Sequence, residues 1–137
     1  MVKDVNRSVE FYTNILSFQF VMGVPEGTQE TKTSYDAATP LVHSMVRKDN
    51  VEVMLHKTIS FTEEFPEFKG TGPHATMGIY IVIDDISSYY AQVRNNIPPF
   101  KDMRTQWYGN KEFYIKDPDG YILGFAQKVS NGKVEQQ

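Results

Sequence analysis

Apolar and polar residues alternate along 108–116 of this chain, and a second, largely apolar stretch follows at 121–125. Alternation of this kind is typical of a strand with one buried face. The sequence Asp-Pro-Asp-Gly at 117–120 joins the two stretches. Pro118 presets one backbone dihedral of a turn, and Gly120 can adopt a positive φ without strain. We therefore predict a β-hairpin here.

Helical periodicity and capping residues predict three helices. The first runs from Asn6, as its N-cap, to about Leu16, and another covers 86–94. Ser60 followed by Glu63 resembles a capping box and predicts a short helix between these two.

The remaining apolar runs predict strands. The polar, threonine-rich segment 25–40 is expected to be mainly loop. The predicted strands are 18–22, 41–47, 51–57 and 77–83, with a short edge strand before Trp107.

Two features recur in the same order along the chain. A helix entry of apolar, acidic and small polar residues occurs at 2–6 and at 83–87, and an apolar closing strand occurs at 50–55 and at 120–125. Chance similarity of two α/β segments is the alternative to an internal repeat. On the repeat interpretation, the single domain 1–137 comprises a first module 1–68, a linker near 69–73, a second module 74–129 and a polar tail 130–137.

Composition narrows the functional classes. A chain of 137 residues is long enough for one domain with its own core. The net charge of −3 argues against a nucleic-acid partner, and no apolar stretch is long enough to cross a membrane. The chain has no cysteine, which excludes disulfides and thiolate metal sites. We expect a cytoplasmic protein.

The order of these motifs resembles the vicinal oxygen chelate superfamily, which includes glyoxalase, bleomycin-resistance and extradiol-dioxygenase proteins. The resemblance implies an α+β fold of two βαβββ modules whose curved sheets form a cleft, and it implies a homodimer. The first strand of the first module would begin before Met1, so it is truncated in this sequence. The motifs that carry the resemblance are Val2–Val5 with Ser8, Phe11-Tyr12, Leu16–Phe18, Asp84–Ile86 and 108–121.

Metal-dependent members of the superfamily hold a divalent ion with His, Gln or Glu on the first and closing strand of each module. The resemblance places these positions at Gly78 and Gly124 in the second module and at Met54 in the first. The fourth position falls before Met1. Glycine offers no ligand, and a thioether does not suit Zn, Ni, Mn or Fe(II). We therefore expect no metal and no other cofactor.

The histidines offer only a weak alternative metal site. The chain has three, His43, His56 and His74, and the last lies in the predicted linker. Glu52 and His56 share one strand face, but four residues of strand span about 13 Å. Metal–ligand bonds are only about 2 Å long, so these two side chains are too far apart to share an ion.

In the cleft that the resemblance implies, strand parity predicts a lining of aromatic and small residues with isolated polar groups. Such a lining suits a small aromatic or heterocyclic ligand. The candidate ligand-binding residues are Glu52, Met54, His56, Gly78, Tyr80, Trp107, Glu112, Tyr114 and Gly124.

Each candidate also has a structural interpretation. Tyr80, Tyr114 and Trp107 could equally fill the sheet interior. Glu112 is expected to pair at the surface with Lys111, Lys116 or Arg104 rather than to act in catalysis, and Glu52 is expected to be solvated.

Three functions remain open at this point. The favoured one is metal-independent sequestration of a small molecule, as in bleomycin-resistance proteins. The second is a glyoxalase-like lyase, isomerase or dioxygenase with a divalent metal. The third is a metal-free enzyme that uses Glu52, Glu112 or His56 as an acid or base.

Overall fold

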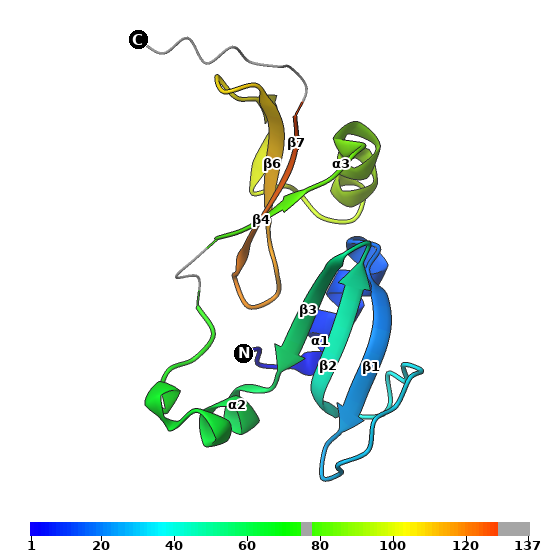
Figure 1. The fold of residues 1–137 in the computed structure, drawn as a ribbon, viewed down its shortest axis with the longest axis vertical. Coiled ribbons are helices and arrows are strands. Elements are labelled where there is room, and N and C mark those ends of the chain that lie inside the picture. Colours follow the sequence, from blue (N-terminus) through cyan, green and yellow to red (C-terminus); the bar gives the residue numbers. More distant parts are fainter. Residues whose placement is uncertain (75–77, 129–137) are drawn as a thin grey trace. The chain divides into compact units, whose positions relative to one another are not determined.

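The computed structural model describes residues 1–74 and 78–128, and the chain forms two compact units. Unit 1 is Met1–His74 and unit 2 is Ala75–Gln137. Each unit has a sheet of its own, as Figure 1 shows. The predicted tail 130–137 and the residue Met77 of the predicted strand 77–83 lie outside the described residues.

Unit 1 packs a helix against a three-stranded antiparallel sheet of order β1-β2-β3. Helix α1 continues as a π-helical turn, Phe11–Ile15, and a 3₁₀ turn, Pro66–Phe68, follows α2. The buried residues Val9, Leu16 and Val46 belong to its core. The elements are α1 (Val5–Glu10), β1 (Gln19–Pro25), β2 (Leu41–Lys48), β3 (Val51–His56) and α2 (Thr58–Glu64).

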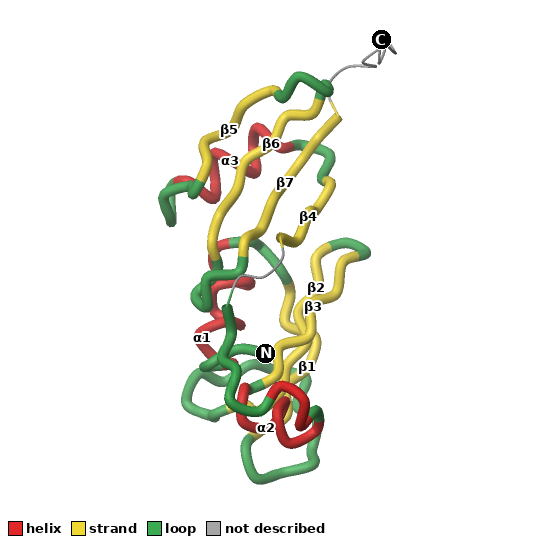
Figure 2. The backbone as a smooth tube through the Cα atoms, turned by 90° about the vertical axis from the view of Figure 1, so that its left-hand side faces the viewer, coloured by secondary structure: helices red, strands yellow, loops and turns green. Residues whose placement is uncertain are grey.

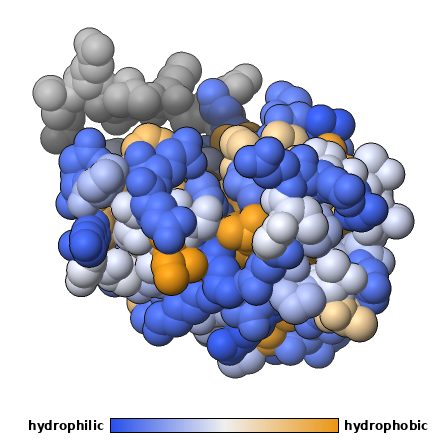
Figure 3. Space-filling view, turned by 90° about the horizontal axis from the view of Figure 1, so that it is seen from below, coloured by the Kyte–Doolittle hydropathy of each residue, from blue (hydrophilic) through white to orange (hydrophobic). Residues whose placement is uncertain are grey.

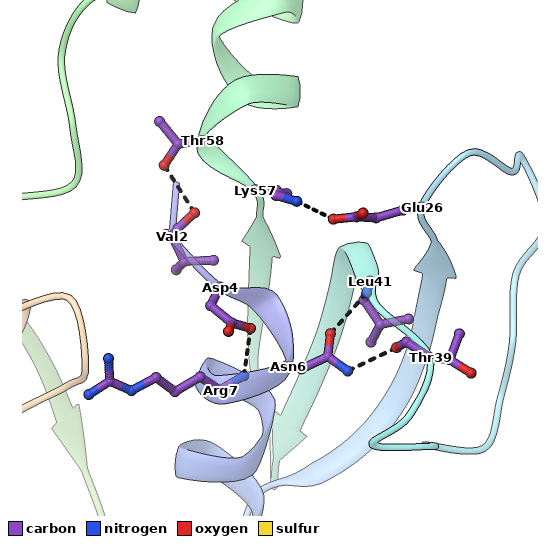
Figure 4. A network of polar contacts seen from close by, with 9 residues as sticks. All are labelled: Val2, Asp4, Asn6, Arg7, Glu26, Thr39, Leu41, Lys57 and Thr58. Atoms are coloured by element: carbon purple, nitrogen blue, oxygen red, sulfur yellow. Dashed lines mark hydrogen bonds and ion pairs between the residues drawn. The ribbon is translucent and has the colours of Figure 1, made fainter.

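Helix α1 begins one residue after Asp4, and Asp4 rather than Asn6 is its N-cap. The Asp4 carboxylate accepts from the backbone N–H of Arg7 at 3.0 Å. The Asn6 side chain instead donates to the carbonyl of Thr39 and accepts from the N–H of Leu41, both at 2.9 Å (Figure 4). Asn6 thus ties the helix to the loop before β2, and the prediction that it caps the helix was wrong.

The N-terminal residues are held against the end of β3. The N–H of Val2 donates to the carbonyl of His56 at 2.8 Å, and the N–H of Thr58 donates to the carbonyl of Val2 at 2.9 Å. Lys57, which forms a parallel bridge with Val2, also makes an ion pair with Glu26 (Figure 4). These contacts place the start of α1 beside the sheet.

Helix α2 has no capping box. It begins at Thr58, so Ser60 lies inside the helix, and no side chain caps its N-terminus. The Ser60 hydroxyl instead contacts Nε2 of His56 at 3.0 Å. The predicted helix exists, but its predicted start was wrong because the Ser60 side chain is engaged with β3.

Unit 2 has a four-stranded sheet of order β4-β7-β6-β5, in which β4 runs parallel to β7 and the other pairs are antiparallel (Figure 2). Helix α3 begins after its N-cap Asp85, whose carboxylate accepts from the N–H of Ser88 at 3.2 Å. The elements are β4 (Gly78–Val82), α3 (Ile86–Arg94), β5 (Lys101–Thr105), β6 (Asn110–Lys116) and β7 (Ile122–Lys128).

The hairpin β6–β7 has the predicted turn. The Asp117 carboxylate accepts from the N–H groups of Asp119 and Tyr121 at 2.9 Å each, and Gly120 adopts φ +86°. The carboxylate therefore stabilises the turn itself, as the turn interpretation of these acidic residues predicted.

The two faces of this sheet differ in character. On the face toward α3, Phe113 and Phe125 are fully buried and stack with ring centroids 5.2 Å apart, and the Tyr89 ring of α3 lies 4.9 Å from that of Phe125. Burial of each such phenylalanine stabilises the fold by about 2 kcal/mol. The residues that alternate with this core lie on the opposite face, as parity predicted.

Among the described residues, no helix is long and apolar enough to cross a membrane. The face of the molecule in Figure 3 is mostly hydrophilic, with hydrophobic residues that are separated from one another.

Candidate functional site

A buried carboxylate lies on the face of the unit 2 sheet that α3 leaves uncovered. Glu112, in the middle of β6, is only 1 % exposed. Tyr108 donates to its Oε1 and Oε2, at 2.7 and 2.8 Å, and Tyr114 donates to Oε2 at 3.0 Å. Tyr80 donates to Oε1. Three phenols from two strands and one turn therefore converge on one carboxylate.

The register of the sheet brings two of these tyrosines together across Gly124. Gly124 of β7 lies opposite Tyr80 on β4 and opposite Tyr114 on β6. A Cβ at position 124 would come within 2.6 Å of Cε1 of Tyr114 and 3.3 Å of Cδ2 of Tyr80. Glycine is therefore required here so that the Tyr114 ring can cross the strand. The Tyr114 ring therefore fills the space beside Gly124.

The third tyrosine comes from the turn between β5 and β6. Gly109 has φ +90°, and its N–H donates to the carbonyl of Gln106 at 3.0 Å. This turn carries Tyr108 back over Glu112, four residues along the chain. Sequence reasoning missed Tyr108, although a glycine that follows an aromatic pair in a hairpin turn was a signal for it.

Asn110 was also missed. Its Nδ2 donates to the hydroxyl oxygen of Tyr80 at 3.1 Å, so this hydroxyl both donates to Glu112 and accepts from Asn110. The phenol orientation is thereby fixed from two sides.

The electrostatics of the cluster favour a charged carboxylate among neutral phenols. Burial raises the pKa of Glu112, but hydrogen bonds from the three tyrosines and Gln106 outweigh it, and the pKa lies below its ordinary value. Burial and the hydrogen bond to Glu112 raise the pKa of Tyr80 and of Tyr114. The hydrogen bond to Glu112 is the main cause that raises the pKa of Tyr108 to about 12.

These contacts overturn the expected surface pairing of Glu112 with Lys111, Lys116 or Arg104. Arg104 lies opposite Glu112 in the β5–β6 register. No lysine, arginine or histidine of segments 1–74 and 78–128 lies within 4.0 Å of the Glu112 carboxylate. The three tyrosines take that place.

The rings remain accessible although their hydroxyls are engaged. Tyr80 and Tyr108 are 48 % and 42 % exposed, and Trp107 is 92 % exposed. The ring centroid of Trp107 lies 5.2 Å from that of Tyr108, nearly perpendicular to it. We call the surface formed by Tyr80, Trp107, Tyr108, Glu112 and Tyr114 the tyrosine face. Gly78 precedes Tyr80 by two residues, and a Cβ there would lie 3.9 Å from the carbonyl oxygen of Ile122, an ordinary contact.

The candidates of unit 1 have other surroundings. Glu52 is exposed and forms a salt bridge with Arg47 on β2, as expected for a solvated glutamate. Met54 is 61 % exposed on the same strand. Glu52 and Met54 therefore have the surroundings of ordinary exposed residues on a sheet.

His56 forms a cross-strand pair with His43. The two residues are register partners, and their ring centroids are 5.3 Å apart. Nε2 of His56 contacts Ser60 at 3.0 Å, and its Nδ1 lies 3.8 Å from Glu64. Burial lowers the pKa of both imidazoles. His74 is exposed, as predicted.

The positions that the family resemblance assigns to a divalent ion do not fit one. Gly78 and Gly124 have no side chain, the space at Gly124 is taken by the Tyr114 ring, and Met54 offers only a thioether. Within 1–74 and 78–128, no group of three or more His, Asp or Glu residues could hold a metal ion.

Comparison with known proteins places this architecture in a family. The family model of the Glyoxalase/Bleomycin resistance protein/Dioxygenase superfamily matches residues 1–125. None of the curated proteins searched matches the chain.

Solved structures share the fold at low sequence identity. A glyoxalase/bleomycin resistance protein/dioxygenase from Nocardioides has TM-score 0.69 and 17% identity, covering 99% of this chain and 83% of that chain. A member of the same superfamily from Sphaerobacter thermophilus has TM-score 0.65 and 19% identity, covering 93% and 90%. TnmS3, an antibiotic binding protein from Streptomyces sp. CB03234, has TM-score 0.62 and 16% identity, covering 93% and 89%. This chain belongs to the Glyoxalase/Bleomycin resistance protein/Dioxygenase superfamily.

Proposed function

We propose that this protein binds a small, flat aromatic or heterocyclic compound on the tyrosine face and does not transform it. The observation that carries the proposal is the Glu112 carboxylate, which holds three phenols in place while the rings of Tyr80 and Tyr108 stay exposed.

Such an arrangement lowers the cost of binding. Tyrosine and tryptophan offer large contact areas with few rotatable bonds. Here the hydroxyls of Tyr80, Tyr108 and Tyr114 are already fixed on Glu112, so little side-chain entropy is lost when a ring stacks on them. Offset or edge contacts between aromatic rings contribute about 0.5–1.5 kcal/mol per pair beyond area burial.

Two of the three acid/base candidates, Glu112 and Glu52, support binding over catalysis. Glu112 is inaccessible and its pKa is lowered, which makes it a poor base at neutral pH. Glu52 is paired with Arg47. The antibiotic binding protein TnmS3 shares the fold, which is consistent with a non-catalytic role for this scaffold.

The proposal includes metal independence, because the residues at Met54, Gly78 and Gly124 do not suit a divalent ion. A glyoxalase-like lyase, isomerase or dioxygenase would need ligands from other residues. We also propose a homodimer, as the family resemblance implies, and sedimentation equilibrium of the purified chain tests this.

Trp107, the only tryptophan of the chain, reports directly on this surface. We expect acridine, a flat neutral heterocycle, to quench its fluorescence saturably and to be recovered unchanged. Tyr108→Leu should weaken binding about fivefold. The matched control is Tyr90→Phe on α3, whose hydroxyl bonds Asp102, and it should leave binding unchanged. Absence of saturable binding across a panel of flat heterocycles, or conversion of the bound compound, would overturn the proposal.

A further inference from the structure

No lysine, arginine or histidine of the described segments lies within 4.0 Å of the Glu112 carboxylate. Buried carboxylates in proteins are usually paired with a cation, because an isolated charge in a low-dielectric site is costly. Here the charge is stabilised only by phenol and amide hydrogen bonds. A carboxylate with a lowered pKa therefore lies beneath the exposed rings of Tyr80 and Tyr108.

The phenols transmit this charge to the surface. Tyr80, Tyr108 and Tyr114 direct their protons toward Glu112, so these hydroxyls have only oxygen lone pairs to offer to a ligand. Tyr80 already uses one lone pair to accept from Asn110. A hydroxyl that donates to a carboxylate is polarised and becomes a better acceptor. The π faces of the same rings attract cations independently.

One of the three phenol rings already contacts a cation of the protein. Nζ of Lys101 stands 5.9 Å from the centroid of the Tyr114 ring. Arg104, opposite Glu112 in the register, is close enough to lower the pKa of Tyr114, against the larger effect of burial. Both side chains are exposed and lie on the edge strand β5. They reduce the negative potential at that edge, whereas Tyr80 and Tyr108 have no lysine or arginine over their rings in the described segments.

We propose that the tyrosine face selects flat heterocycles that carry a positive charge. The inference rests on the proposed function, since it names the ligand class for the same surface. Glu112 supplies the charge, and the rings of Tyr80 and Tyr108 supply the stacking surface. The ligand's cationic ring lies over the phenols, and its N–H groups, where present, donate to the phenol oxygens.

Three probes with one ring system test the inference: N-methylacridinium, acridine and acridine-9-carboxylate, which are cationic, neutral and anionic at pH 8. Quenching of Trp107 fluorescence gives their dissociation constants. We expect the cation to bind about tenfold more tightly than acridine and the anion to bind most weakly. The preference for the cation should shrink as salt is added.

Two variants assign the preference to named groups. Glu112→Gln keeps the side-chain shape, and we expect it to reduce the ratio between the affinities for N-methylacridinium and for acridine about tenfold when both are measured in this variant. Arg104→Gln removes an exposed cation at the edge strand and should tighten the cation instead. Because Arg104 is exposed, this variant keeps the test valid even if Glu112→Gln fails to fold.

The outcomes distinguish failure of the proposed function from failure of the proposed preference for cations. If none of the three probes binds, the proposed function fails. If they bind with equal affinity, or the anion binds best, only the charge selection is overturned. A cation preference that survives unchanged in folded Glu112→Gln, or an unchanged cation affinity in Arg104→Gln, would also refute it.

Discussion

The Tyr108 hydroxyl lies 2.7 and 2.8 Å from the two carboxylate oxygens of Glu112, although the residues belong to a turn and to the strand that follows it. This pair links the hairpin turn to the centre of the sheet face. It also explains why the pKa of Tyr108 is raised to about 12. Local stability and the shape of the binding surface therefore depend on the same carboxylate.

Replacement of Glu112 by alanine should destabilise the protein. The hydroxyls of Tyr80, Tyr108 and Tyr114 would lose their common acceptor, and we expect a loss of about 1–3 kcal/mol in the free energy of unfolding. Urea denaturation measures this. Glu52→Ala is the matched control, because it breaks an exposed ion pair and should cost about 0–1 kcal/mol. Equal losses in the two variants would contradict the central role of Glu112.

The two glycines of the sheet face should respond differently to alanine. Gly124→Ala places a Cβ 2.6 Å from the Tyr114 ring and should cost about 1–3 kcal/mol of stability through overpacking. It should also weaken acridine binding, since the ring must move. At Gly78 the nearest atom is a carbonyl oxygen 3.9 Å away, so Gly78→Ala should be tolerated. Thermal unfolding of both variants measures the difference. Similar melting temperatures would refute the close contact of the Tyr114 ring with Gly124.

Asp4→Ala should destabilise α1 by about 0.5–2 kcal/mol, because it removes the acceptor for the N–H of Arg7. Glu63→Ala, in the sequence that resembled a capping box, should change stability by less than about 0.5 kcal/mol. Chemical denaturation of both variants measures the difference. A larger loss of stability in Glu63→Ala than in Asp4→Ala would contradict this and would favour the capping box that Ser60 and Glu63 resembled.

Stability should fall in mild acid because of the His43–His56 pair. Burial lowers the pKa of both imidazoles in the folded state below the ordinary value of about 6.5, although Glu64 opposes this for each. The unfolded chain then binds more protons just below pH 6.5, so stability is full above about pH 6.5 and is lost as the pH falls toward the folded-state pKa.

Unfolding measured from pH 8 to pH 5 should show this loss, and His43→Gln should reduce it. His74→Gln, at an exposed position, is the control and should leave the pH profile unchanged. A wild-type profile that is flat between pH 8 and pH 5 would contradict the direction of these pKa shifts.

Local chemistry made part of the fold predictable. The β6–β7 turn follows from Pro118 and Gly120, and α3 has the predicted bounds, 86–94, because its cap and its apolar spacing agree. The N-cap of α1 was misassigned because aspartate and asparagine favour that position equally. Only the hydrogen bonds of Asn6 with Thr39 and Leu41 show that Asp4, and not Asn6, is free to cap the helix.

The site was only partly predictable for a related reason. Parity placed Glu112, Tyr114, Tyr80 and Gly124 on one face, but it gave no register between β4 and β7. Glu112 has lysines and arginines as sequence neighbours, whereas one of its partners is 32 residues away. Long-range pairing, which periodicity does not specify, therefore decided its surroundings.

An NMR titration of the ¹⁵N-labelled chain with acridine tests the central claim most directly. The account predicts saturable shifts of the Trp107 indole N–H and of backbone amides near Tyr80 and Tyr114, and no comparable shifts around Glu52. Shifts confined to unit 1 would contradict the account, and so would the absence of shifts at the highest soluble concentration of acridine.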